Sequence, residues 1–84
     1  MQEKEIGTIT HYYGHLSVGI IKLSDTLKAG EDIHIKGHSS DFSQKVDSLE
    51  IEHQIVNEGK AGDMVGIKVA GKVHEHDKVF KVSA

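Results

Sequence analysis

Histidine is the residue type in this chain whose number and spacing most favour chemistry. Seven of the 84 residues are histidines. On a strand, His74 and His76 would place both imidazoles on one face, close enough to share a metal ion. Glu75, Asp77 or a distant histidine would then complete the ligand set. Because this spacing alone does not specify a metal site, we expect two exposed histidines on a polar turn, and no metal or other cofactor.

Four further histidines border predicted turns and strand ends. His11 and His15 flank a hairpin turn, and His34 and His38 flank the end of a strand. We expect each of them to be solvated or to cap a turn. Because imidazole titrates near neutral pH, a metal- or pH-responsive function based on the histidines stays open as an alternative.

Side chains suited to nucleophilic catalysis are present, but their arrangement predicts no active site. The chain has no cysteine. Residues 38–41 (His-Ser-Ser-Asp) supply all three residue types of a catalytic triad in consecutive positions. A triad requires these groups to converge in space around a cleft, which adjacency in sequence does not provide. We therefore expect a polar turn at 38–41, no catalytic residues and no enzymatic activity.

Glu50 and Glu52 form a pair of carboxylates on one face of a predicted strand, with Leu49 and Ile51 on the other face. Two like charges at this spacing can raise one pKa and so support acid–base chemistry. Such perturbed carboxylates need burial and a pocket. We expect a solvated face instead, which discourages the strand from pairing with another chain.

Composition excludes several classes of partner. The chain has 13 acidic and 10 basic residues, a net charge of −3, and every basic residue is lysine. Strong autonomous binding of nucleic acid is disfavoured, because it relies on a basic surplus and often on arginine. No glycine-rich nucleotide motif occurs. The apolar runs are too short for a membrane span and the amino end is too polar for a secretory signal, so we expect a cytoplasmic location.

Alternating apolar residues between glycines and polar turns predict strands in place of helices. The length allows one domain, residues 1–84, with a core from about residue 6 to 82. The expected strands cover residues 6–13, 16–23, 32–36, 42–53, 65–69 and 78–82, with 54–56 extending the fourth or pairing separately. Changes in apolar phase near 19–21 and between Val46 and Leu49 predict bends or bulges. The sequence therefore predicts an all-β domain, a small closed six-stranded barrel, mostly antiparallel and of Greek-key type, because closure removes exposed edges.

Two glycine-containing segments carry a family resemblance: residues 27–37 (LKAGEDIHIKG) and 59–69 (GKAGDMVGIKV). With residues 7–9 (GTI) and 18–20 (VGI), they resemble the second domain of translational GTPases of the elongation factor Tu type. The resemblance spans about residues 6–82. It implies a barrel of the translation-protein type that serves as a non-catalytic binding or adaptor module, in contact with a protein or ribonucleoprotein partner.

A second resemblance rests on residues 10–13 (THYY), 35–42 (IKGHSSDF) and 51–53 (IEH). These segments look like the barrel at the carboxyl end of collagenase-like peptidases, which lacks catalytic residues. The alternative that follows is an accessory domain or subunit of such a peptidase. For either family, we predict that a partner would contact the rim of the barrel at Tyr13, Lys36, His38 and Lys60.

Overall fold

The structure is built from antiparallel strands. A computed structural model describes residues 2–83 of the chain. All strand pairs in that range are antiparallel and none of its residues is helical, which confirms the all-β prediction. No helix long and apolar enough to cross a membrane occurs between residues 2 and 83.

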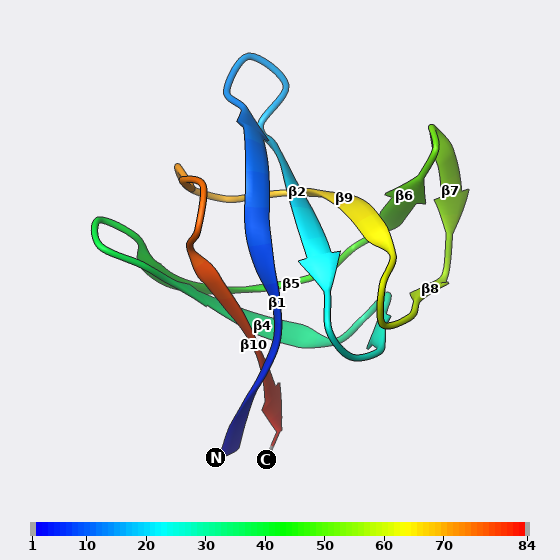
Figure 1. The fold of residues 1–84 in the computed structure, drawn as a ribbon, viewed down its shortest axis with the longest axis horizontal. Coiled ribbons are helices and arrows are strands. Elements are labelled where there is room, and N and C mark those ends of the chain that lie inside the picture. The colour runs from blue at the N-terminus through cyan, green and yellow to red at the C-terminus, as the bar shows by residue number, and fades with distance from the viewer. Residues whose placement is uncertain (1, 84) are drawn as a thin grey trace.

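Ten strands follow one another along the chain (Figure 1). In order they are β1 (Gln2–Tyr13), β2 (Val18–Leu23), β3 (Leu27–Lys28), β4 (Asp32–Lys36), β5 (Asp41–Lys45), β6 (Leu49–Ile51), β7 (Gln54–Val56), β8 (Glu58–Gly59), β9 (Met64–Lys68) and β10 (Lys78–Ser83).

The prediction of a closed six-stranded barrel is wrong. Eight strands form one sheet in the order β5-β4-β10-β1-β2-β9-β6-β7, and β3 and β8 form a separate pair. The two edge strands, β5 and β7, do not pair with each other among the described residues. One cause of the higher strand count is the predicted strand 42–53, which breaks between Lys45 and Leu49 into β5 and β6. The phase change between Val46 and Leu49 marks this break.

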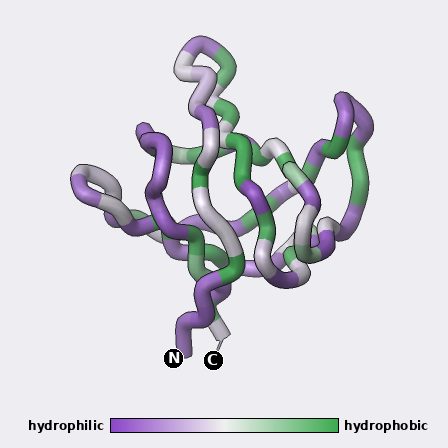
Figure 2. The backbone as a smooth tube through the Cα atoms, in the orientation of Figure 1, coloured by the Kyte–Doolittle hydropathy of each residue, from purple (hydrophilic) through white to green (hydrophobic). Residues whose placement is uncertain are grey.

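The core follows the alternation of apolar residues along the strands, which Figure 2 shows as a change of hydropathy from residue to residue. In β4, for example, Ile33 and Ile35 are completely buried. Burial of such side chains is the main stabilising contribution in a domain of this size. The buried apolar residues are Ile6, Ile9, Ile21, Leu23, Leu27, Ile33, Ile35, Val46, Leu49, Val65, Ile67, Val69, Val73 and Val79.

Two bulges in β1 bend the sheet. The register of β1 against β10 shifts between Glu5 and Gly7, and its register against β2 shifts between Ile9 and His11. Each extra residue increases the local twist of the strand. The prediction of a bulge at 19–21 of β2 is therefore wrong. The bulge lies in the neighbouring strand β1, at Thr10, so Val18 and Ile20 face outward without a break in β2.

Candidate functional site

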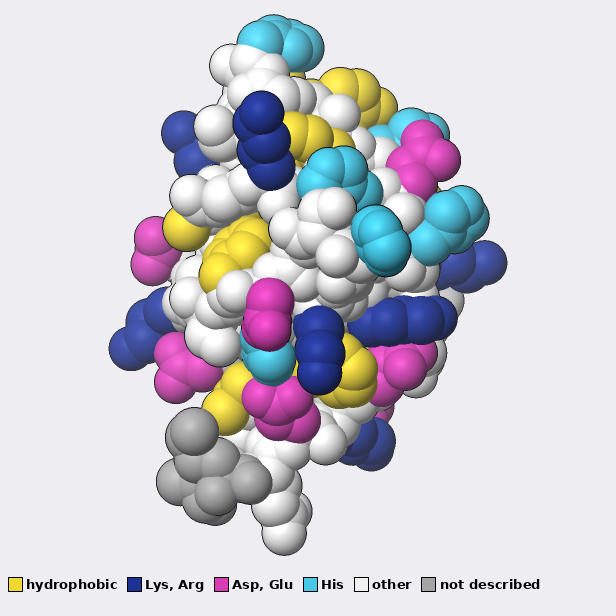
Figure 3. All heavy atoms as spheres, turned by 90° about the vertical axis from the view of Figure 1, so that its left-hand side faces the viewer, with side chains coloured by type: hydrophobic (Ala, Val, Ile, Leu, Met, Phe, Trp, Pro, Cys, Tyr) yellow, Lys and Arg dark blue, Asp and Glu magenta, His cyan; other side chains and the backbone are white. Residues whose placement is uncertain are grey.

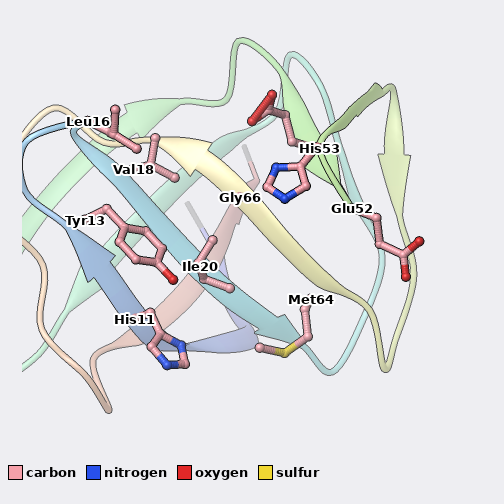
Figure 4. A pocket seen from close by; sticks show the side chains of 10 residues that line it. His11, Tyr13, Leu16, Val18, Ile20, Glu52, His53, Met64 and Gly66 are labelled. Atoms are coloured by element: carbon pink, nitrogen blue, oxygen red, sulfur yellow. The ribbon is translucent and has the colours of Figure 1, made fainter.

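An open groove with a volume of about 390 Å³ lies on the outer face of the sheet, over β1, β2, β9 and the β6–β7 turn (Figure 4). We call it the outer groove. Several exposed apolar side chains lie close together in its lining. A monomeric domain normally buries such side chains or scatters them singly over its surface. Leu16 is 54% exposed, Tyr13 44% and Met64 42%. The apolar and aromatic side chains that line the groove are Tyr13, Leu16, Val18, Ile20 and Met64.

The hollow results from a row of cross-strand neighbours in which one position has no side chain. His11 pairs with Ile20, Ile20 pairs with Gly66, and Gly66 pairs with Glu50. A Cβ atom at Gly66 would lie 3.3 Å from Ile20 Cδ1 and 3.6 Å from Val18 Cγ1. Any larger residue at Gly66 would therefore fill the groove from below.

The wall beside Gly66 is formed by the β6–β7 hairpin. Glu50 and Gly66 are the one residue pair that joins β6 to β9, so the hairpin leans away from β9 beyond this pair (Figure 1). Ile51 pairs with Gln54, which leaves Glu52 and His53 as a two-residue loop. Both have positive φ, 51° and 66°, the conformation of a type I′ turn. Glu50, Glu52 and His53 all line the groove.

The opposite wall depends on the bulge in β1. Because Thr10 is the extra residue, His11 and Tyr13 both point to the outer face (Figure 4). Their rings are nearly parallel, with centroids 6.3 Å apart and planes inclined by 6°. The arrangement as a whole offers apolar and aromatic contact area with two carboxylates at one side. It is suited to binding an extended, partly apolar segment, and no group in it is placed as a nucleophile beside a base.

A serine, a histidine and an aspartate do meet elsewhere, at the turn before β10. Ser40 Oγ lies 3.2 Å from His74 Nδ1, and Asp77 Oδ2 lies 3.7 Å from the same nitrogen. In a catalytic triad the serine and the aspartate contact different nitrogens of the imidazole. Ser40 also donates to the carbonyl of Lys72 over 3.1 Å and is buried. This cluster therefore joins two loops and does not have triad geometry.

Asp77 holds the turn together. Its Oδ2 accepts a hydrogen bond from the backbone N–H of His74 at 2.9 Å, and its side chain is 5% exposed. It packs so closely against the β4–β5 loop that a Cβ at Gly37 would collide with its Oδ1. His74 and His76 thus lie on an exposed turn, as one of the two sequence interpretations predicts, and not on a strand face.

A metal centre has no ready-made ligand set. Several histidine side chains gather on the face that carries the β4–β5 hairpin (Figure 3). However, no group of three or more histidine, aspartate or glutamate side chains within residues 2–83 is placed to hold a metal ion. His74 and His76 remain the candidate metal ligands predicted from the sequence, and no third ligand lies beside them among these residues.

His34 differs from its prediction as a solvated or turn-capping residue. Its Nδ1 lies 2.8 Å from Glu3 Oε2 and its Nε2 lies 2.5 Å from Asp41 Oδ1. The hydrogen bond with Asp41 and then that with Glu3 raise the pKa of His34, against the opposing effect of its partial burial. The hydrogen bond from His34 likewise lowers the pKa of Asp41. His34 therefore connects β1, β4 and β5 electrostatically.

The predicted partner-binding residues are spread over the molecule. Tyr13 lines the outer groove. Lys36 ends β4 and His38 follows in the β4–β5 loop, on the opposite side of the molecule in Figure 1 from the turn after β8 that contains Lys60. All four are exposed. The structure therefore brings Tyr13 together with groove residues that were not predicted as partner contacts, and leaves the other three apart from them.

The signal that could have revealed the groove was the outward parity of Val18 and Ile20. The bend predicted near residues 19–21 instead returns both residues to the core. Glu50 and Glu52 were expected on one solvated strand face. Both are exposed beside apolar side chains, but only Glu50 lies on β6, and Glu52 lies in the turn that follows it. The evidence available in the sequence was therefore an apolar pair, Val18 and Ile20, and an acidic pair, Glu50 and Glu52, each at alternate positions that can point outward.

Comparison with known proteins finds similarity to parts of peptidases. An uncharacterized protease of Methanocaldococcus jannaschii is 36% identical over 77 residues, which cover 90% of this chain and 19% of the protease. The C-terminal domain of a U32 peptidase of Geobacillus thermoleovorans superposes with a TM-score of 0.88 at 14% identity, covering 93% of this chain and 91% of that domain. Its selenomethionine variant gives a TM-score of 0.86 at 13% identity and covers 90% and 96% of the two chains. No family model matches the chain.

The fold of this chain is thus that of the C-terminal domain of a U32 peptidase. The chain spans about a fifth of the length of the curated protease that it matches. These relatives support the resemblance to the barrel of collagenase-like peptidases. They give no support to the resemblance to translational GTPases, which rested on short glycine-containing turn and strand segments that different β folds can share.

Proposed function

We propose that this chain is a non-catalytic accessory module of a peptidase related to the U32 peptidases, with the outer groove as its contact surface. The observation that carries the proposal is the match of 90% of the chain to 19% of a protease. A segment of that size is too small to contain the whole protease and large enough to be one complete module. The cytoplasmic location expected from the sequence stays a prediction.

Two features of the chain support a role without catalysis. The outer groove is lined by apolar side chains, histidines and carboxylates with no nucleophile among them. Ser40 and Asp77 compete for one nitrogen of His74, so the cluster with triad residue types could not transfer a proton in the way a triad does. Binding is the activity that this geometry can perform.

A chimera tests the proposal. The 77-residue segment of the Methanocaldococcus protease that matches this chain is deleted, or replaced by residues 2–83 of this chain. Hydrolysis of fluorescein-labelled gelatin is compared for the intact, deleted and chimeric proteases, after thermal unfolding has shown that each is folded. We expect the deletion to lose most of the hydrolysis and the chimera to recover it. A chimera no better than the deletion, or hydrolysis by this chain alone, would contradict the proposal.

A further inference from the structure

The carboxylates that line the outer groove have no internal partner. Glu50 and Glu52 line it, and neither forms an ion pair with any residue between 2 and 83. No lysine is among the groove residues. Lys68 pairs with Val18 in one flanking cross-strand row and lines a neighbouring, smaller hollow, and Lys22 pairs with Met64 in the other flanking row. The two carboxylates therefore attract a cation placed near the β6–β7 hairpin.

The apolar part of the groove lies directly beside these carboxylates. Gly66 separates Ile20 from Glu50 in one row across the sheet, so the hollow passes from aliphatic to acidic within two strand spacings. Adjacent strands lie about 4.8 Å apart, and side chains two positions apart in an extended peptide point to the same side, about 6.6 Å from each other. An aliphatic side chain over Gly66 would therefore place a lysine or arginine two positions away within reach of Glu50 and Glu52.

The backbone conformation of the β6–β7 turn is unfavourable for the residues that it contains. Non-glycine residues rarely adopt positive φ, and a two-residue type I′ loop favours Asn-Gly. Glu52 and His53 occupy these two positions with φ of 51° and 66°. Strain of this kind concentrates at binding sites. The strain agrees with a role in binding for the Glu52 and His53 side chains, because an unstrained Asn-Gly turn would lack both of them.

We propose that the outer groove binds an extended protein segment in which an aliphatic residue stands two positions from a lysine or arginine. The inference rests on the proposed function, because it names what the accessory module holds for its peptidase. The aliphatic side chain occupies the hollow over Gly66, and the cationic side chain pairs with Glu50 and Glu52. The Tyr13 ring and the Leu16 side chain cover the other end of the segment.

Titration of the isolated 84-residue chain with short capped peptides tests this directly. The Leu-Lys probe is acetyl-Gly-Leu-Gly-Lys-Gly-Gly-amide, and the matched probes replace its Lys with Glu or its Leu with Gly. Amide chemical shifts of the ¹⁵N-labelled chain are followed by NMR. We expect the first probe to shift the amide signals of Tyr13, Ile20 and Gly66. We also expect it to bind about fivefold more tightly than either matched probe, as one partly exposed ion pair or one aliphatic contact would produce.

Variants identify the groove as the binding surface. Gly66→Val should abolish the shifts, because the valine side chain fills the hollow, and its folding is checked in the same spectra. The double variant Glu50→Gln/Glu52→Gln should remove the preference for Lys over Glu. The double variant Glu58→Gln/Glu75→Gln changes the net charge equally at exposed positions outside the groove and should keep that preference. Equal binding of the three probes, or shifts confined to other faces, would overturn the inference.

The two proposals fail in different ways. If the groove binds the Leu-Lys probe but the chimeric protease is inactive, the inference about the ligand stands and the assignment to a peptidase is wrong. If the chimera is active, and remains fully active with Gly66→Val, the accessory role stands and the groove is not its binding surface. Probe binding that is the same for the wild-type chain and the Gly66→Val variant contradicts the inference independently of the protease.

Discussion

The side-chain amide of Gln44 pairs with the backbone of Ala70 as a neighbouring strand would. The N–H of Ala70 donates to Gln44 Oε1 over 2.7 Å, and Gln44 Nε2 donates to the carbonyl of Lys68 over 2.7 Å. Gln44 lies in the edge strand β5, and Ala70 follows the end of β9. A side chain, in place of a backbone ladder, thus connects this edge of the curled sheet to the segment after β9.

Replacing Gln44 should weaken the fold measurably. In Gln44→Ala the carbonyl of Lys68 and the N–H of Ala70 both lose their partner. The site is partly open to water, which can replace some of the lost bonding. We therefore expect the free energy of unfolding to fall by about 1–2 kcal/mol, measured by urea denaturation.

Two comparisons show whether the amide itself is responsible. Gln44→Glu keeps an acceptor for Ala70 but places a carboxylate against the Lys68 carbonyl, so its loss should be at least as large as that of Gln44→Ala. Ser43→Ala changes the exposed neighbour in the same strand and should alter the unfolding free energy by less than about 0.5 kcal/mol. Equal stability of Gln44→Ala and Ser43→Ala would refute the role of the side-chain amide.

Local pattern was enough to predict most of the strands but not how the sheet is completed. The alternation in residues 32–36 predicts β4 with its observed bounds, whereas the phase change after Val46 predicts only a bend in one strand, where the structure has a break between β5 and β6. The pairing of Leu27–Lys28 with Glu58–Gly59 involves two residues on each side, too few to leave a periodic pattern. The contact of Gln44 with residues 24 and 26 positions away depends on the final curvature of the sheet, which no local pattern carries.

The candidate site was only partly predictable for a related reason. The chemistry-bearing residues Glu50, Glu52 and Tyr13 were all recognised, but as separate features of a rim or a solvated face. Their convergence depends on the bulge at Thr10 and on the single β6–β9 pair at Glu50 and Gly66. His34 meets Glu3 across 31 residues of sequence, so its role as an electrostatic connection was equally hidden.

The β6–β7 turn should show opposite effects on stability and on binding. In Glu52→Asn/His53→Gly, both positions receive the residues that a type I′ turn favours, so the strain at the positive φ angles is relieved. We expect the free energy of unfolding to rise by about 1 kcal/mol. The same change removes one wall of the groove, so binding of the Leu-Lys peptide should weaken severalfold. Urea denaturation and NMR titration of one preparation measure both effects.

The matched change for this prediction is Glu58→Asn, at an exposed position outside the groove. It removes the same charge without altering a turn with positive φ. It should leave stability within about 0.5 kcal/mol of the parent chain and leave peptide binding unchanged. Weaker folding of the turn variant would show that Glu52 and His53 are not strained.

Asp77 should be important for stability and unimportant for any chemistry. In Asp77→Ala the N–H of His74 loses its acceptor in a partly buried turn, and the contact with Gly37 is lost. We expect the free energy of unfolding to fall by about 1–3 kcal/mol. Glu75→Ala in the same turn is the control, because Glu75 is exposed and should tolerate the change. Equal losses for the two variants would contradict the role given to Asp77.

The His34 cluster should make the stability of the chain depend on pH. The pKa of His34 is raised above its ordinary value of 6.5 by Asp41 and Glu3, so the stability it contributes is fully present below pH 6.5 and is lost as the pH rises through the folded-state pKa. The pKa of Asp41 is lowered from 3.8 by His34, so its contribution is present above pH 3.8 and is lost as the pH falls. The combined contribution is therefore largest between these two values. The midpoint of thermal unfolding should be higher at pH 5.5 than at pH 8.5.

Substitution of His34 separates this effect from that of the other histidines. Glutamine retains hydrogen-bonding groups but has no ionisable proton, so in His34→Gln the difference between the midpoints at pH 5.5 and pH 8.5 should shrink. His15→Gln removes an exposed histidine from the β1–β2 turn and should leave the difference intact, because His15 forms no ion pair among residues 2–83. If His34→Gln keeps the full difference, the pH dependence has its origin elsewhere, and the bridge between Glu3 and Asp41 does not contribute to stability.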